Sequence, residues 1–186
     1  VDKLIEVAQL YGFDGWFINQ ETAEEEALSE YLDKFDVEGG GQSTGASGGK
    51  VLTEDHAVRM QEFLSYFKQQ APDMELIYYD SMTIDGKMDW QNALTEKNAP
   101  YMKDAEGNSV ADSMFLNFWW TTDSLAPEEL LKTSAELAEE KQIDPYDLYA
   151  GVDIQSNGYD TPIKWNLFEK PDGGTYTSLG LYCPSW

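Results

Sequence analysis

The chain has 186 residues, of which 41% are hydrophobic and 13% aromatic, a composition typical of a folded globular domain. Thirty-five acidic residues against twelve basic ones give a net charge of -23, which argues against nucleic acid or an anionic membrane surface as a partner. The one cysteine, Cys183, excludes an internal disulfide and a cysteine-based metal cluster, and no apolar run approaches the roughly 18 residues of a membrane span.

The first predicted elements are a helix, a strand and a long insertion. Apolar residues recur at helical spacing over Leu4–Tyr11, and Gly12 offers the left-handed conformation that ends a helix. The short apolar run Phe13–Ile18 predicts a buried strand. Residues 24–50 are first acidic and then rich in glycine, with six glycines among residues 38–49. We therefore expect a flexible insertion at about residues 24–50.

Two more helices and four more strands are predicted downstream. Thr53 can cap a helix with an acidic first turn and an apolar stripe, which predicts a helix over Glu54–Gln70. Another helix is expected to begin at Pro127. The four predicted strands are apolar almost throughout and do not alternate with polar residues: Met74–Tyr79, Met114–Trp119, Leu148–Val152 and Ser178–Tyr182.

Strands and helices alternate in this prediction, and nearly continuous apolar strands are typical of a parallel sheet covered on both faces. The fold class is therefore α/β. Five of the six tryptophans lie at or just after the carboxyl end of a predicted strand: Trp90, Trp119, Trp120, Trp165 and Trp186. Such ends meet at the active-site face of a (β/α)8 barrel, whereas a nucleotide-binding sheet needs a glycine-rich turn that this sequence lacks.

A complete barrel takes about 250 residues, and only five strands are predicted here. We therefore expect residues 1–186 to be part of a single catalytic (β/α)8 TIM barrel domain. Val1 opens a helical pattern without a signal peptide or a cap before it. The roughly three remaining strands are expected before Val1 or after Trp186, in a longer protein.

The densest chemical signal is the segment FDGWFINQE, residues 13–21. Side chains alternate along a strand, so Asn19 and Glu21 should project into the same space at its exit. A glycosidase usually needs two carboxylates, but one is enough when the substrate's own 2-acetamido group attacks. Asn19 could then orient the acetamide, while Glu21 protonates the leaving oxygen and later deprotonates water.

Five segments, in this order, resemble glycoside hydrolase family 85, the endo-β-N-acetylglucosaminidases: YGFDGWFINQE at Tyr11–Glu21, YYDSM at Tyr78–Met82, DWQN at Asp89–Asn92, FLNFWW at Phe115–Trp120 and YAGVD at Tyr149–Asp153. The resemblance covers nearly the whole chain except the insertion. It implies hydrolysis of the β-1,4 bond between the two core N-acetylglucosamines of asparagine-linked glycans. The implied mechanism retains the anomeric configuration and passes through an oxazoline formed by the substrate's acetamide.

The same resemblance implies roles for individual residues. Glu21 would be the general acid/base, Asn19 would promote oxazoline formation, and Tyr79 would hydrogen-bond near the reacting acetamide. The candidate substrate contacts all lie at or after strand ends: Trp90, Trp119, Trp120, Asn117 and Asp153. Alternation along the strand would let only one of Trp119 and Trp120 face a sugar. No metal or other cofactor is expected.

Two alternatives stay open at this point. The family 18 chitinase motif D-G-x-D-x-D-x-E places its acid at the same distance from an Asp-Gly pair as Glu21 here, but Phe17 and Asn19 replace two of its aspartates. A non-catalytic glycan-binding barrel could use the same aromatic residues.

The resemblance also implies partners and a location. The partners would be the N-glycans of glycoproteins, the remaining barrel strands, and accessory β-rich modules of the same protein, without nucleic acid or membrane insertion. We expect a secreted or surface-attached protein in a bacterium, and a cytoplasmic one in a eukaryote.

Overall fold

The computed structural model describes residues 1–22, 52–157 and 160–184, so the predicted insertion and Trp186 lie outside the described residues. The strands are β1 (Gly15–Ile18), β2 (Glu75–Tyr79), β3 (Ser113–Leu116), β4 (Leu148–Asp153) and β5 (Ser178–Tyr182). The α-helices are α1 (Asp2–Tyr11), α3 (Glu54–Gln70), α4 (Leu130–Glu140), α5 (Ile154–Asn157) and α6 (Trp165–Phe168). Short 3-10 helices are η1 (Ala99–Tyr101), η2 (Trp119–Thr121), η3 (Ala126–Glu128) and η4 (Pro145–Asp147).

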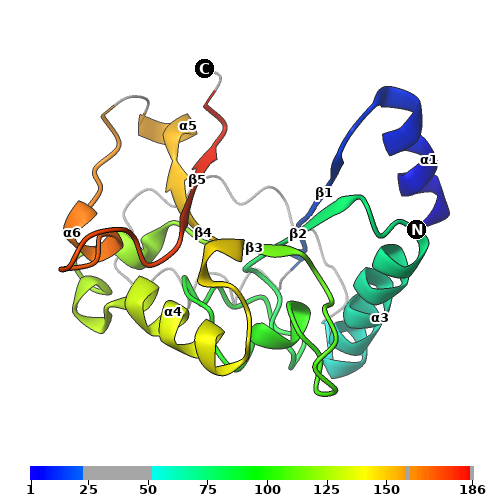
Figure 1. The fold of residues 1–186 in the computed structure, drawn as a ribbon, viewed down its shortest axis with the longest axis horizontal. Coiled ribbons are helices and arrows are strands. Elements are labelled where there is room, and N and C mark those ends of the chain that lie inside the picture. Colours follow the sequence, from blue (N-terminus) through cyan, green and yellow to red (C-terminus); the bar gives the residue numbers. More distant parts are fainter. Residues whose placement is uncertain (23–51, 158–159, 185–186) are drawn as a thin grey trace.

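The five strands form one sheet in the order β1-β2-β3-β4-β5, and each neighbouring pair is parallel. All the carboxyl ends therefore lie along one edge (Figure 1). Consecutive parallel strands that stay neighbours are the arrangement of a (β/α)8 barrel. The expected α/β class, with part of such a barrel, is confirmed.

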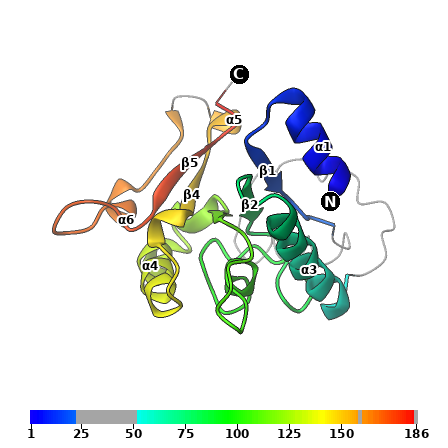
Figure 2. The ribbon, with the colours of Figure 1, turned by 45° about the vertical axis from the view of Figure 1, so that its right-hand side comes forward.

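The hydrophobic core lies between the outer face of the sheet and two helices. Both views show α3 and α4 on the same side of the sheet (Figures 1 and 2). Leu64 of α3 and Leu131 of α4 are buried in the same cluster as the strand residues Leu76, Met114 and Leu148. Burying each of these side chains stabilises the fold by about 1.5–3 kcal/mol, so packing on this face holds the strands in register.

The inner face of the sheet carries aromatic rings. Phe115 of β3 contacts Phe17 of β1 and Tyr79 of β2, with ring centroids 5.6 and 6.1 Å apart. On the two following strands, glycines leave room for the Phe115 ring. A Cβ atom at Gly151 would come within 2.7 Å of this ring, and one at Gly180 within 2.4 Å. The ring of Phe115 thus lies next to residues of all four other strands.

Two helix boundaries follow the predicted caps, and a third does not. Gly12 has a φ of 73° and its N–H bonds the carbonyl of Ala8, which ends α1 as expected. Thr53 caps α3 in a capping box in which the ring of His56 accepts the backbone N–H of Thr53 at 3.1 Å. The predicted start of α4 at Pro127 is wrong. Pro127 lies in η3, and Glu129, with a φ of 48°, separates η3 from α4.

Candidate active site

The residues that end β1 form the first part of the candidate site. Both Asn19 and Glu21 are exposed, and the amide Nδ2 of Asn19 donates to Oε2 of Glu21 at 3.0 Å. The strand begins at Gly15, where a Cβ atom would lie only 1.9 Å from the carbonyl oxygen of Glu75. Close approach to β2 therefore requires glycine here, and it fixes where the strand delivers the two polar side chains.

Trp90 reaches the same carboxylate from the loop that follows β2. Its indole Nε1 donates to Oε1 of Glu21 at 3.0 Å, so each carboxylate oxygen accepts one side-chain hydrogen bond. Trp119, in η2, packs against Trp90 edge to face, with ring centroids 5.4 Å apart. A carboxylate beside two partly exposed indoles is a suitable surface for a sugar, because indole faces pack on the apolar faces of sugar rings.

Asn92 joins the two tryptophans through the backbone. It is buried and adopts the left-handed conformation, with a φ of 56°. Its side-chain oxygen accepts the backbone N–H of Trp119 at 3.0 Å, and its amide donates to the carbonyl of Trp90 at 3.2 Å. This one side chain thereby couples the loop after β2 to the turn after β3.

The buried carboxylate of Asp80 holds this loop in place. It accepts the backbone N–H groups of Gln91 at 3.3 Å and Asn92 at 2.6 Å, and the side-chain amide of Asn98 at 2.8 Å. Burial raises the pKa of Asp80 to about 7, although these three hydrogen bonds and one from the backbone of Asn117 lower it. The rise in pKa from desolvation is therefore larger than the fall caused by the four hydrogen-bond donors together.

We expect Asp80→Asn to remove a pH-dependent part of the stability. The native pKa of about 7 lies above the ordinary value of 3.8, so between these values the folded state holds a proton that the unfolded chain has released. The stability contributed by this proton is full below about pH 4 and is lost as the pH rises through about 7. The free energy of unfolding of the wild type minus that of the variant should therefore fall from about pH 5 to about pH 8 in denaturant titrations.

A matched control is Asp123→Asn. Asp123 is exposed, and a hydrogen bond and the positive charge of Lys164 lower its pKa, so its stability contribution is lost only as the pH falls to acid values. The free energy of unfolding of the wild type minus that of Asp123→Asn should stay constant from about pH 5 to about pH 8. A flat difference for Asp80→Asn as well would contradict a raised pKa at Asp80.

Tyr79 and Asn117 lie together on the inner face, where β2 and β3 end. The phenol O–H of Tyr79 donates to Oδ1 of Asn117 at 2.8 Å. Only 6% of Tyr79 and 2% of Asn117 are exposed. The structure therefore makes Asn117 a partner of Tyr79, and its burial argues against a direct contact between Asn117 and a sugar.

The two tryptophans after β3 were expected to alternate on a strand, which is wrong. The strand ends at Leu116, and both residues lie in η2. Trp120 is 1% exposed and its indole donates to the carbonyl of Gly151 at 2.9 Å. Trp120 is consequently a core residue, which argues against its contact with a sugar, whereas Trp119 is partly exposed beside Trp90.

Tyr182, at the end of β5, lies near the candidate site and was not singled out from the sequence. It is paired with Asp153 in the register of β4 and β5. The pKa of its phenol is raised, first by a hydrogen bond with Cys183 and by partial burial, and further by the negative charges of Asp153 and Glu21. Tyr182 therefore links β5 to the candidate site. Alternation along β5 from Gly180, whose neighbour is the inner-face ring of Phe115, could have revealed it.

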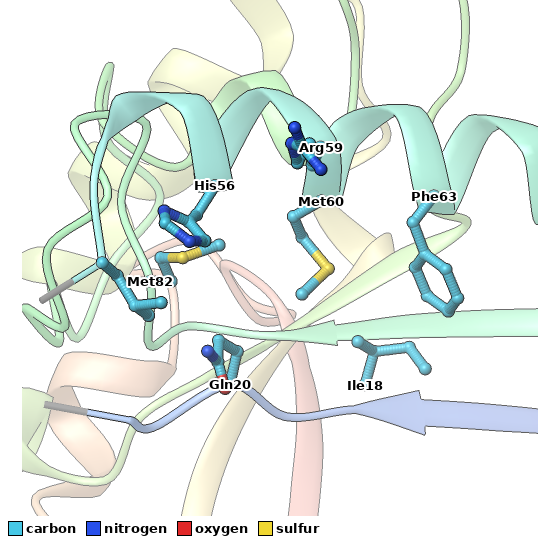
Figure 3. Close-up of a pocket in the computed structure, with 8 residues that line it drawn as sticks. Ile18, Gln20, His56, Arg59, Met60, Phe63 and Met82 are labelled. Atoms are coloured by element: carbon cyan, nitrogen blue, oxygen red, sulfur yellow. The ribbon is translucent and has the colours of Figure 1, made fainter. Parts of the chain in front are cut away.

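A cavity of about 350 Å³ lies on the other side of β1, against α3. Figure 3 shows Ile18 and Gln20 reaching toward α3, where Met60 and Phe63 line the same space. Alternation thus sends Gln20 to the helix side and its neighbours Asn19 and Glu21 to the opposite side. The cavity is not the place where the polar pair meets the tryptophans.

The described residues offer neither a group of metal-ligating side chains nor a membrane-spanning helix. In that part of the chain, no three His, Cys, Asp or Glu side chains are grouped so that they could hold a metal ion. None of the helices described is both long enough and apolar enough to cross a membrane.

The whole chain is similar to known proteins of one family. The family model for glycosyl hydrolase family 85 matches residues 1–186. Cytosolic endo-beta-N-acetylglucosaminidase 1 of Arabidopsis thaliana is 27% identical over 100% of this chain and 22% of its own length. The cytosolic endo-beta-N-acetylglucosaminidase of Homo sapiens is 26% identical over 100% of this chain and 20% of its own length.

Among solved structures, the glycoside hydrolase domain of Endo-D from Streptococcus pneumoniae superposes with a TM-score of 0.72 and 29% identity. The match covers 98% of this chain and 25% of that one. The chain therefore spans about a fifth to a quarter of the length of the relatives it matches.

Proposed function

Because this chain belongs to glycosyl hydrolase family 85, we propose that it forms part of the catalytic barrel of an endo-β-N-acetylglucosaminidase. The bond cleaved is the β-1,4 bond between the two core N-acetylglucosamines of asparagine-linked glycans. The observation that carries the proposal is the pair of hydrogen bonds on Glu21, one from Asn19 and one from Trp90. This arrangement puts an acid, an acetamide-binding amide and an aromatic surface in one place.

The proposed reaction has two steps and retains the anomeric configuration. In the first, the acetamide carbonyl oxygen of the substrate attacks the anomeric carbon, the glycosidic C–O bond breaks, and the carboxylic acid of Glu21 gives its proton to the leaving oxygen. Asn19 supports the attack because its Oδ1 can accept the acetamide N–H and so raise the electron density on the attacking oxygen. The product of this step is a protonated sugar oxazoline, an oxazolinium ion that keeps the acetamide N–H beside Asn19.

In the second step water attacks the anomeric carbon of the oxazoline. The Glu21 carboxylate, left by the first step, takes a proton from this water while the oxazoline C–O bond breaks and restores the acetamide. Attack from opposite faces in the two steps gives overall retention. Tyr79 hydrogen-bonds near the acetamide, and Trp90 with Trp119 carries the acceptor sugar.

Residues 1–186 belong in this proposal to a single barrel domain, with the remaining strands and accessory β-rich modules supplied by the same protein. The family match sets the chitinase alternative of family 18 aside. Binding without catalysis is the alternative that experiment must exclude. The relatives from Arabidopsis thaliana and Homo sapiens are named cytosolic enzymes, and they therefore give no support to secretion. Secretion stays a prediction for a bacterial source.

The test is product analysis with the intact protein and a defined high-mannose glycopeptide. Mass spectrometry is expected to find a single N-acetylglucosamine left on the peptide, and NMR of the released glycan to find the β anomer first. A peptide without any sugar, an initial α product, or turnover of chitin oligomers alone would each overturn the proposal.

A further inference from the structure

The amide of Asn117 is incompletely paired although it is buried. Its Oδ1 accepts the Tyr79 phenol at 2.8 Å, but its Nδ2 has no partner, the one such buried side-chain atom among the described residues. An unpaired buried N–H donor costs about 1–3 kcal/mol. An unpaired buried carbonyl oxygen is tolerated more readily. In the free protein, the Asn117 amide N–H beside the Tyr79 phenol is therefore available to donate a hydrogen bond.

The surroundings fix the backbone of Asn117 but not the orientation of its side-chain amide. Its backbone N–H donates to the buried carboxylate of Asp80, and its neighbour Phe115 is packed on the inner face. The last torsion of an asparagine is broad and roughly two-fold, so half a turn exchanges Oδ1 and Nδ2 at small cost. After that turn Nδ2 donates to the phenol oxygen of Tyr79, and the phenol proton points away from Asn117.

We propose that Asn117 is a positioning residue that sets the direction of the Tyr79 hydroxyl proton. In the free protein Asn117 accepts this proton. With substrate bound, Asn117 donates through Nδ2, and Tyr79 gives its hydrogen bond to the substrate instead. The proposal rests on the proposed function, in which Tyr79 hydrogen-bonds near the reacting acetamide. It assigns Asn117 an effect on the reaction without any contact with the sugar.

The decisive variant is Asn117→Asp in the intact protein, because a carboxylate can only accept and so keeps the phenol proton. We expect kcat on the glycopeptide to fall by about 10- to 100-fold, as far as in Tyr79→Phe, with a smaller change in KM. At lower pH the introduced carboxyl group takes up a proton and can donate, so activity relative to wild type should recover. The double variant Tyr79→Phe/Asn117→Asp should lose no more than Tyr79→Phe alone.

Two further variants separate positioning from packing and from charge. Asn117→Leu has a similar shape but neither accepts nor donates, so it should keep more activity than Asn117→Asp. Its effect should vanish in the Tyr79→Phe background, which tests the proposal even if Asn117→Asp does not fold. Gln69→Glu, on the exposed side of α3, adds the same charge and should leave kcat unchanged.

Losses that multiply when the Tyr79 and Asn117 variants are combined would overturn the positioning role, as would a pH profile for Asn117→Asp parallel to that of wild type. These failures differ from a failure of the proposed function. If the wild-type protein cleaves the glycopeptide and the losses multiply, only the role of Asn117 is wrong. If the wild-type protein leaves the glycopeptide intact, the proposed function is wrong and this inference falls with it.

Discussion

Glu21→Gln is expected to stop hydrolysis while glycan binding persists. The amide cannot release a proton to the leaving oxygen, and general acid–base catalysis contributes about 10²- to 10⁴-fold, so kcat should fall by about 10³-fold. The shape of the side chain is kept, and the amide oxygen can still accept the Trp90 indole N–H that the carboxylate accepts at 3.0 Å. Turnover of a defined glycopeptide and calorimetric binding of the same glycopeptide measure the two effects separately.

Glu62→Gln is the matched control, because this exposed carboxylate lies on α3, away from the polar pair. It should behave as wild type in both measurements. Undiminished product release by Glu21→Gln would show that another group is the acid. A wild-type protein that binds the glycopeptide without cleaving it would establish the non-catalytic alternative.

Asn19→Ala is expected to lose hydrolysis of the natural glycan and to keep the conversion of a preformed glycan oxazoline. Removing one preoriented hydrogen-bonding group from a transition state costs about 10²- to 10³-fold in kcat. That loss applies to closing the oxazoline, and a substrate in which the ring is already closed bypasses the step. Rates on the two substrates, measured with the same intact variant, give the comparison.

Gln20→Ala is the control for this experiment, since its amide is adjacent in sequence but lines the cavity against α3. It should leave both rates near wild type. The Asn19 amide also donates to Glu21 at 3.0 Å, so its loss could act through the proton shuttle. In that case the rates on both substrates would fall equally, and the role of Asn19 in closing the oxazoline ring would be refuted.

The sheet could be predicted from the sequence because its strands are continuous apolar runs, and α3 because Thr53 caps it. The placement of Asn19 and Glu21 on one side of β1 followed from alternation alone, and their hydrogen bond agrees with it. Local rules of this kind need only a few neighbouring residues, so a single sequence is sufficient for them.

The supporting contacts of the site could not be predicted in this way. Asp80 is held by groups up to 37 positions away, and nothing in the sequence near it distinguishes a helix cap from a buried acceptor. Trp120 was misplaced because β3 ends at Leu116, where alternation no longer applies, and because its partner Gly151 lies on the next strand. These contacts depend on the tertiary fold rather than on a repeating pattern.

The ring of Phe115 has a geometric consequence for anything that binds above it. It occupies the space that Gly151 and Gly180 leave open, with Phe17 and Tyr79 beside it. In the proposed function, a pyranose that enters from the carboxyl ends of the strands would rest on this platform. The phenyl group and the two glycines would then set the height of the anomeric carbon relative to Glu21 without taking part in the chemistry.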